Sequence, residues 1–195
     1  MLDITMNDGS NKEYSAYGGI GLISSRLTLE GPIVKDKGSF IISGRRTYAD
    51  LFFPLVSDDL ENSAMYFYDL NAKLNYSFGD NDRVFLSTYT GRDVFNFNDE
   101  FGFDWGNTTA TLRWNHIFSN KLFSNTTLIY SDYNYDITME DAEQSTTVTS
   151  GIKDVNFKED LQYYFKTDHT FKFGLNGIYH TFNPGEISVA GNTNF

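Results

Sequence analysis

Residue types that commonly carry chemistry are few in this chain, and their spacing matches no catalytic motif. The three histidines, His116, His169 and His180, share no spacing that would place them around one metal ion. The sequence has no recognisable Ser/His/Asp arrangement, no glycine-rich phosphate loop and no HExxH zinc motif. Because there is no cysteine, disulfides and thiolate metal sites are excluded. We therefore expect that the chain is not an enzyme and holds no cofactor or metal ion.

The nearest likeness to a metal site is a calcium-loop pattern that begins at Asp132. Asp132, Asn134 and Asp136 alternate, and Glu143 falls at the twelfth position of an EF-hand-like count. The sixth position, where EF-hand loops need glycine for a sharp turn, is Ile137. Alternate residues of a strand share one face, so a strand produces the same pattern. We predict a strand here, with the three polar side chains facing inward, and no calcium site.

Two acidic stretches, 93–105 and 136–144, are the best candidates for binding a ligand or an ion. In the first stretch, aromatic rings stand between amides and carboxylates, a mixture that can stack on a sugar ring or hold a cation. We predict that both stretches are loops, and solvated loops that only cover the rest of the protein are the alternative. The candidate ligand contacts in the first stretch are Asp93, Phe97, Asp99, Glu100, Asp104 and Trp105.

The element that organises the chain is a predicted strand over residues 66–78. Apolar or aromatic residues occupy every second position from Tyr66 to Phe78, with polar residues between them, which indicates one apolar and one polar face. Soluble strands usually have about five or six residues, whereas crossing a bilayer on a tilt takes about 9–11. This strand is therefore long enough to cross a membrane. Its apolar face also begins and ends on aromatic rings, as membrane girdles require.

The rest of the chain repeats strands that are joined alternately by short turns and long loops. Short turns are expected at 79–82, 119–121 and 166–169, and long loops at about 51–64, 92–105, 136–152 and from 183 onward. This alternation is typical of a transmembrane barrel with periplasmic turns and extracellular loops. We therefore predict an all-β fold: part of an antiparallel transmembrane β-barrel with about nine long strands. The other strands are expected at 12–30, with a reversal near its glycines, and at 39–50, 83–91, 106–117, 122–135, 153–165 and 170–182.

The composition agrees with this fold and excludes other classes. There are 18 Phe, 13 Tyr and 2 Trp but 3 Pro, so aromatic strand formers are abundant and strand breakers scarce. No apolar run approaches the roughly 18 residues of a transmembrane helix. A net charge of −11 leaves no basic face for a nucleic acid, so no such partner is expected. The first ten residues lack the basic and apolar regions of a signal peptide, so we expect either that a leader was removed or that the chain is a fragment.

Several local motifs resemble one family of outer-membrane proteins. Residues 19–51 look like the start of the barrel in TonB-dependent receptors, of the kind with an N-terminal carboxypeptidase-regulatory-like domain. The segment Leu2–Met6, followed by Asp8 and Gly9, is similar to the last strand of that family's plug. The motifs that carry the resemblance are Leu-Thr-Leu-Glu-Gly-Pro at 27–32, Lys-Asp-Lys-Gly at 35–38, Gly-Arg-Arg-Thr-Tyr at 44–48, Tyr-Thr-Gly-Arg-Asp at 89–93 and His-x-Phe-x-Pro-Gly at 180–185.

The resemblance implies a division of the chain and a set of partners. Residues 1–10 would end the plug, and residues 11–195 would form the incomplete N-terminal part of a barrel in the bacterial outer membrane, in contact with lipid and lipopolysaccharide. The family imports a nutrient, here unidentified, and the TonB complex would act through the missing N-terminal plug region. A surface lipoprotein is left open as a further partner. The candidate contacts with the barrel interior or plug are Lys73, Arg113, Asn115, Lys158, Asp160 and Gln162.

Two questions stay open at this point. A small self-contained outer-membrane barrel of eight strands, with a structural or adhesive role, is the main alternative, and a soluble lipocalin-like barrel is a weaker one. The adjacent residues Arg45 and Arg46 are expected on opposite faces of their strand, one toward the interior and one near lipopolysaccharide phosphates. A bulge that turns both side chains inward would serve equally well.

Overall fold

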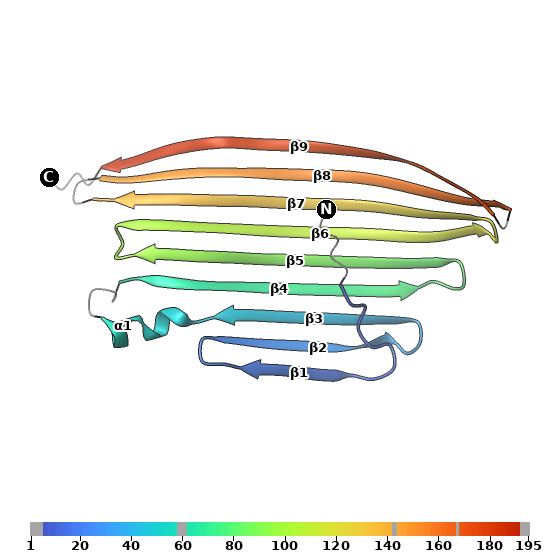
Figure 1. Cartoon of the computed structure of the whole chain (residues 1–195), viewed down its shortest axis with the longest axis horizontal. Coiled ribbons are helices and arrows are strands. Elements are labelled where there is room, and N and C mark those ends of the chain that lie inside the picture. Colours follow the sequence, from blue (N-terminus) through green and yellow to red (C-terminus); the bar gives the residue numbers. More distant parts are fainter. Residues whose placement is uncertain (1–5, 58–61, 142–143, 167, 192–195) are drawn as a thin grey trace.

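The computed structural model describes residues 6–57, 62–141, 144–166 and 168–191, and it forms one antiparallel sheet of nine strands in sequence order (Figure 1). A short helical segment, η1 (Ala49–Phe52) and α1 (Phe53–Val56), lies between the third and fourth strands. Within the described residues, the outer edges of the first and last strands have no strand partner. The strands are β1 (Ser15–Ile20), β2 (Ser24–Val34), β3 (Gly38–Thr47), β4 (Ala64–Ser77), β5 (Asp82–Phe97), β6 (Phe101–Ser119), β7 (Leu122–Glu140), β8 (Gln144–Lys166) and β9 (His169–Gly191).

The structure confirms the all-β fold and the number of strands, but three predicted loops are wrong. The predicted loop at 92–105 is reduced to residues 98–100, because β5 and β6 continue through the stretch on either side. Asn98 and Asp99 adopt positive φ angles of 50° and 56°, which asparagine and aspartate tolerate better than most residues. Similarly, β7, β8 and β9 extend into the loops predicted at 136–152 and from 183 onward.

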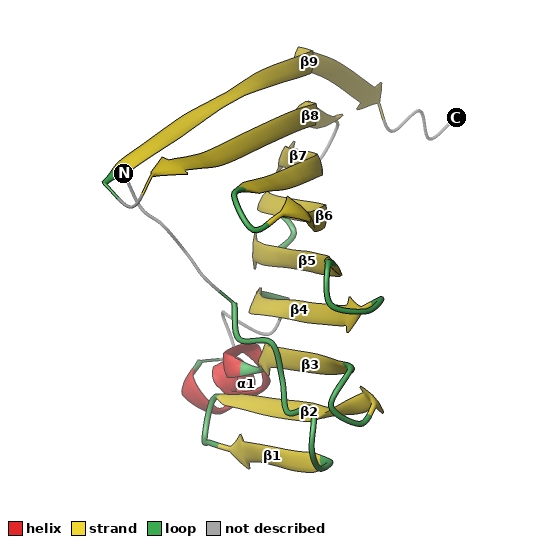
Figure 2. Ribbon diagram, turned by 90° about the vertical axis from the view of Figure 1, so that its right-hand side faces the viewer, coloured by secondary structure: helices red, strands yellow, loops and turns green. Residues whose placement is uncertain are grey.

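The two faces of the sheet differ in polarity. In an antiparallel pair, directly opposed residues point to the same face, so the pairing register assigns every strand residue to a face. Figure 2 shows that the sheet curves, and residues 6–14 run along its concave side. No hydrophobic residue in the described part of the chain is buried. The buried polar residues are Thr28, Ser39, Thr47, Asn75, Ser124 and Thr127.

An apolar band covers the convex face next to the short turns. On β8 it extends from Val155 to Tyr163, a length within the roughly 9–11 residues of a transmembrane strand. The opposed residues Leu86, Leu112 and Leu128 form its middle on β5, β6 and β7. The band is interrupted by Glu159, whose carboxylate accepts a hydrogen bond of 2.6 Å from Thr126 Oγ1. Leu112 and Leu128 are 45% and 46% exposed, so the band has no cover in the described structure.

Beyond this band, the polarity of the two faces is exchanged. We call this part of the sheet the distal region: residues 93–105, 133–140 and 144–152 on β5–β8, and 182–191 on β9. There the convex face is predominantly polar, with Arg92 at its border and Asp104 and Asp136 within it. The concave face carries aromatic and aliphatic side chains instead. The latter are Phe95, Phe97, Phe101, Phe103, Trp105, Tyr133, Tyr135, Ile137, Val148, Ile152, Phe182 and Ile187.

Two other features concern the arrangement of the chain. Residues 6–14 cross the concave face next to β2–β4 (Figures 1 and 2). Residues 1–5, which include most of the plug-like strand predicted at Leu2–Met6, lie outside the described residues. No helix in the described part of the chain is long and apolar enough to cross a membrane.

Candidate functional sites on the concave face

The best-defined polar cluster on the concave face holds the N-terminal segment. Lys73 Nζ lies 2.6 Å from Asp8 Oδ1 and donates a hydrogen bond of 2.7 Å to the Met6 carbonyl oxygen. The guanidinium of Arg83 lies 3.4 Å from the other carboxylate oxygen of Asp8. The Lys73 side chain is 12% exposed, so little water competes with these partners. The cluster therefore ties the start of the described chain to the middle of the sheet.

Two buried residues complete this cluster. Ser39 Oγ and Asn75 Nδ2 donate hydrogen bonds of 2.6 and 3.1 Å to the carbonyl oxygen of Asp8. Asn75 Nδ2 also lies 2.6 Å from Ser39 Oγ, and Asn75 Oδ1 accepts a hydrogen bond of 2.8 Å from Arg83. Ser39 and Asn75 are 2% and 4% exposed. Lys73 was predicted from the sequence, whereas Ser39, Asn75 and Arg83 were not. Asn75 could have been found from its position two residues after Lys73 on the same face.

The six residues predicted to contact the barrel interior or plug all lie on the concave face. The cross-strand register places Arg113 and Asn115 on β6, and Lys158, Asp160 and Gln162 on β8, on the same face as Lys73. Of the six, Lys73 alone contacts residues 6–14 in the described structure. Lys158 and Asp160 form an ion pair of 2.6 Å. Contacts of the others with a plug or ligand stay a prediction.

The residues predicted as ligand contacts do not form one group. Asp93, Phe97 and Trp105 lie on the concave face. In contrast, Asp99 and Glu100 lie in the turn between β5 and β6. Asp104 points to the convex face, where it forms an ion pair with Arg92. The prediction of a loop here is therefore wrong, because most of the stretch belongs to two strands whose successive side chains alternate between faces. Ligand binding by these residues stays a prediction.

Arg92 is the centre of an acidic cluster on the distal convex face. Besides Asp104, its guanidinium approaches Asp136 Oδ2 at 3.7 Å, and Thr149 Oγ1 donates a hydrogen bond of 2.5 Å to Asp136 Oδ1.

We expect Arg92→Ala to lower the free energy of unfolding by about 1 kcal/mol, because it leaves two carboxylates opposed across β6 and β7 in a partly exposed site. Chemical denaturation at low salt would measure this. Arg46→Ala is the control, and an equal loss in both variants would contradict the role of the cluster.

The structure places Arg45 and Arg46 on opposite faces. Arg45 lies on the concave face, with its guanidinium 2.6 Å from Asp69 and 4.8 Å from the centre of the Phe67 ring. Arg46 lies on the convex face, 5.3 Å from the centre of the Tyr66 ring. The pairing of β3 with both neighbours is regular at these positions, so the alternative of a bulge is excluded. The contact of Arg46 with lipopolysaccharide stays a prediction.

The calcium-loop residues face away from the interior, which corrects the prediction. Asp132, Asn134 and Asp136 lie on the convex face, and Asp132 is 3.3 Å from Lys153 Nζ. Glu143 lies outside the described residues. Among the residues that the structure describes, no group of three or more His, Cys, Asp and Glu could hold a metal ion.

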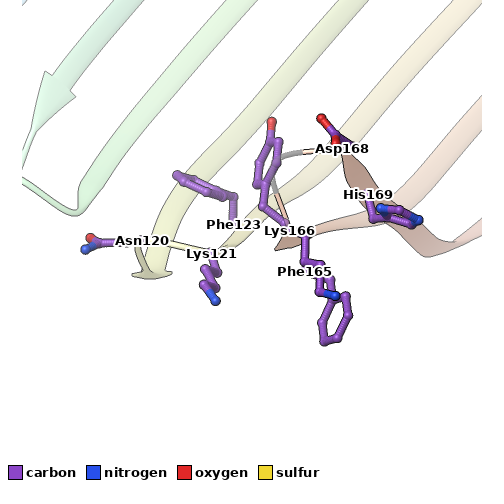
Figure 3. A pocket seen from close by; sticks show the side chains of 8 residues that line it. Asn120, Lys121, Phe123, Phe165, Lys166, Asp168 and His169 are labelled. Atoms are coloured by element: carbon purple, nitrogen blue, oxygen red, sulfur yellow. The ribbon is translucent and has the colours of Figure 1, made fainter.

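A hollow of about 890 Å³ lies at the turn edge of the sheet, away from these clusters (Figure 3). It is formed where the turn between β6 and β7 approaches the turn between β8 and β9. Lys121, Lys166 and His169 line it together with the acidic Asp168. It is broadly open, and these side chains come from the turns and the adjoining strand ends, so it does not enclose a ligand. Its lining residues are Asn120, Lys121, Phe123, Tyr164, Phe165, Lys166, Asp168 and His169.

Comparison of the chain with protein-family models, with curated proteins and with solved structures gave no match. The functional interpretation therefore depends on the sheet, its two faces and the clusters described above.

Proposed function

We propose that this chain forms part of the wall of a TonB-dependent outer-membrane receptor that imports a nutrient. The observation that supports the proposal most is the distribution of polarity over the sheet. An apolar convex band of transmembrane length lies opposite a polar concave face, as in a barrel that faces lipid outside and a polar interior inside. The concave face also holds residues 6–10, as a barrel wall would hold the end of a plug.

The open edges of the sheet support a larger barrel over a small self-contained one. In the described structure β1 and β9 do not pair with each other. An unpaired backbone N–H or C=O in hydrocarbon costs several kcal/mol. Further strands beside β1 and β9 would satisfy these groups in the membrane. The alternative, a small outer-membrane barrel with a structural or adhesive role, requires the two edges to meet.

The proposal is tested with the protein expressed from its complete reading frame. We expect the protein to fractionate with the outer membrane, to migrate differently on gels before and after heating, and to bind the purified periplasmic domain of TonB. The control is the same protein with its export signal kept and the rest of the region upstream of residue 6 deleted, which should insert but no longer bind TonB. A protein that inserts and never binds TonB would favour the structural or adhesive alternative. One that stays out of the outer membrane would contradict both.

A further inference from the structure

The distal concave face is an aromatic surface of a kind that binds ligands. The rings of Phe103 and Trp105 have centroids 4.8 Å apart, and Phe103 lies 6.3 Å from Tyr135. Tyr133 extends this row, with its ring 6.4 Å from that of Tyr135. These distances fall within the range of favourable aromatic pairs. The rings therefore form a continuous, pre-arranged surface across β6 and β7.

An unpaired carboxylate lies at the inner border of this surface. Asp93 forms no hydrogen bond or ion pair within the described part of the chain, and it is only partly exposed. Its direct cross-strand partners are Phe67 on β4 and Trp105 on β6. Directly opposed residues have Cβ atoms about 5 Å apart. The carboxylate is therefore flanked by an aromatic ring on each side.

Nearby groups on the same face add hydrogen-bond acceptors, and none of them neutralises the negative charge of Asp93. Asn107, on the row next to Trp105, has a buried Oδ1 with no hydrogen-bond partner among the described residues. The Tyr89 hydroxyl occupies the space that a Cβ on Gly91 would take, beside Asp93. Arg45, the cation nearest in the register, is already paired with Asp69 at 2.6 Å.

We propose that Phe67, Asp93, Trp105 and Asn107, here called the Asp93 cluster, bind the ammonium group of an amphipathic organic cation whose apolar body lies on the distal concave face. The carboxylate supplies the opposite charge, Asn107 Oδ1 accepts an N–H hydrogen bond, and the two rings interact with the cation through their π-systems. The Phe67 ring already has a guanidinium 4.8 Å from its centre. The net charge of −11 favours the approach of a cation over that of an anion.

The cation site is argued from the geometry alone. Only the identification of this cation as the imported ligand rests on the proposed function. A sugar would also stack on the rings, but its hydroxyls do not require a charged partner. The negative charge of Asp93 and the Oδ1 of Asn107, which has no hydrogen-bond partner among the described residues, favour an ammonium group. Binding of an uncharged sugar is therefore an outcome that the experiment must separate.

The test compares three soluble probes that share a phenylethyl body and differ in the polar group: phenylethylammonium, 2-phenylethanol and 3-phenylpropionate. Each is titrated calorimetrically into the purified full-length protein in detergent, and maltose is titrated as the sugar. We expect the ammonium probe to bind about tenfold more tightly than the alcohol, and the carboxylate probe to bind most weakly. Equal affinity for ammonium and alcohol, or binding of maltose alone, would overturn the proposal.

Matched variants locate the site. Asp93→Asn should weaken the ammonium probe about tenfold and change the alcohol less than about twofold. Trp105→Leu should weaken both. Asp132→Asn removes the same charge from the convex face and should change neither probe, so equal effects of Asp93→Asn and Asp132→Asn would contradict the proposed site. This measurement does not need TonB, so the two proposals fail separately. A protein that binds TonB but does not prefer the ammonium probe contradicts only the cation site. A protein that prefers the ammonium probe but does not bind TonB contradicts only the proposed receptor function.

Discussion

Leu112→Arg is expected to lower the free energy of unfolding in lipid vesicles by about 2–4 kcal/mol, the cost of an arginine near the midplane on the lipid face of a barrel. Leu112 lies on β6 in the middle of the convex band. It is directly opposite Leu86 on β5 and Leu128 on β7. If the band faces lipid, the guanidinium loses its hydration. Urea titration of the full-length protein in vesicles, followed by tryptophan fluorescence, measures the change.

The matched control for this experiment is one residue away on the other face. Thr111 lies on the concave side, opposite Ser87 and Ile129. Thr111→Arg should change the free energy of unfolding by less than about 1 kcal/mol, because the interior of a barrel is polar. If both arginines cost the same, or Thr111→Arg costs more, the convex face is not the lipid face and the proposed membrane orientation is wrong.

Asn75→Ala is expected to release residues 6–10 from the sheet. The side chain of Asn75 joins Ser39, Asp8 and Arg83 at a site that is 4% exposed. Its loss leaves buried donors and acceptors without partners, at a cost of about 2–3 kcal/mol. Since each 1.4 kcal/mol is a factor of ten, hydrogen exchange in this segment should become about 30- to 140-fold faster.

Exchange mass spectrometry on the peptide that contains residues 6–12 follows this release in the full-length protein. Asn71→Ala is the control, because Asn71 lies on the same strand and face but donates its hydrogen bond to Asp69. The control should change the exchange rate less than about threefold. Unchanged exchange in Asn75→Ala would mean that the segment is held by other contacts, such as the ion pair of Asp8 with Lys73.

The strands could be predicted from the sequence because their alternation depends only on neighbouring residues. Side chains at Tyr66, Tyr68 and Leu70 share a face whatever the rest of the chain does. The number of strands and the inward position of residues such as Lys158 follow from this rule. The reversal expected near Gly18 and Gly19 is also present, with β1 ending at Ile20 and β2 beginning at Ser24.

The prediction for the distal region was wrong because the alternation of apolar and polar residues does not determine which of the two lies on the convex face. We assumed that apolar residues point outward and polar residues inward along whole strands. Beyond Gly91 the opposite holds: Phe95 and Phe103 point inward, whereas Asp104 and Asp136 point outward. The same exchange explains why Asp132 lies on the convex face. In the proposed barrel the distal region lies beyond the lipid, where an apolar outer surface is not required.

The cluster around Asp8 was beyond prediction for a different reason. Lys73 and Asn75 are separated from the N-terminal segment by more than sixty residues, and no local pattern relates them. Only the curvature of the sheet, which brings its concave face against the segment, creates these contacts. Likewise, the flanking of Asp93 by Phe67 and Trp105 depends on the register of three strands.

The unequal lengths of the strands give the proposed barrel a sloping rim. β3 has 10 residues and β8 has 23, so β8 extends about 40 Å farther along the strand direction, at roughly 3.3 Å per residue. If the short turns lie at one level, the wall is low at β1–β3 and high at β7–β9. A molecule arriving over the low side would meet the inner surface of the high side first. The aromatic rings on that surface would then be the first part of the wall that an incoming ligand contacts, before it moves into the interior.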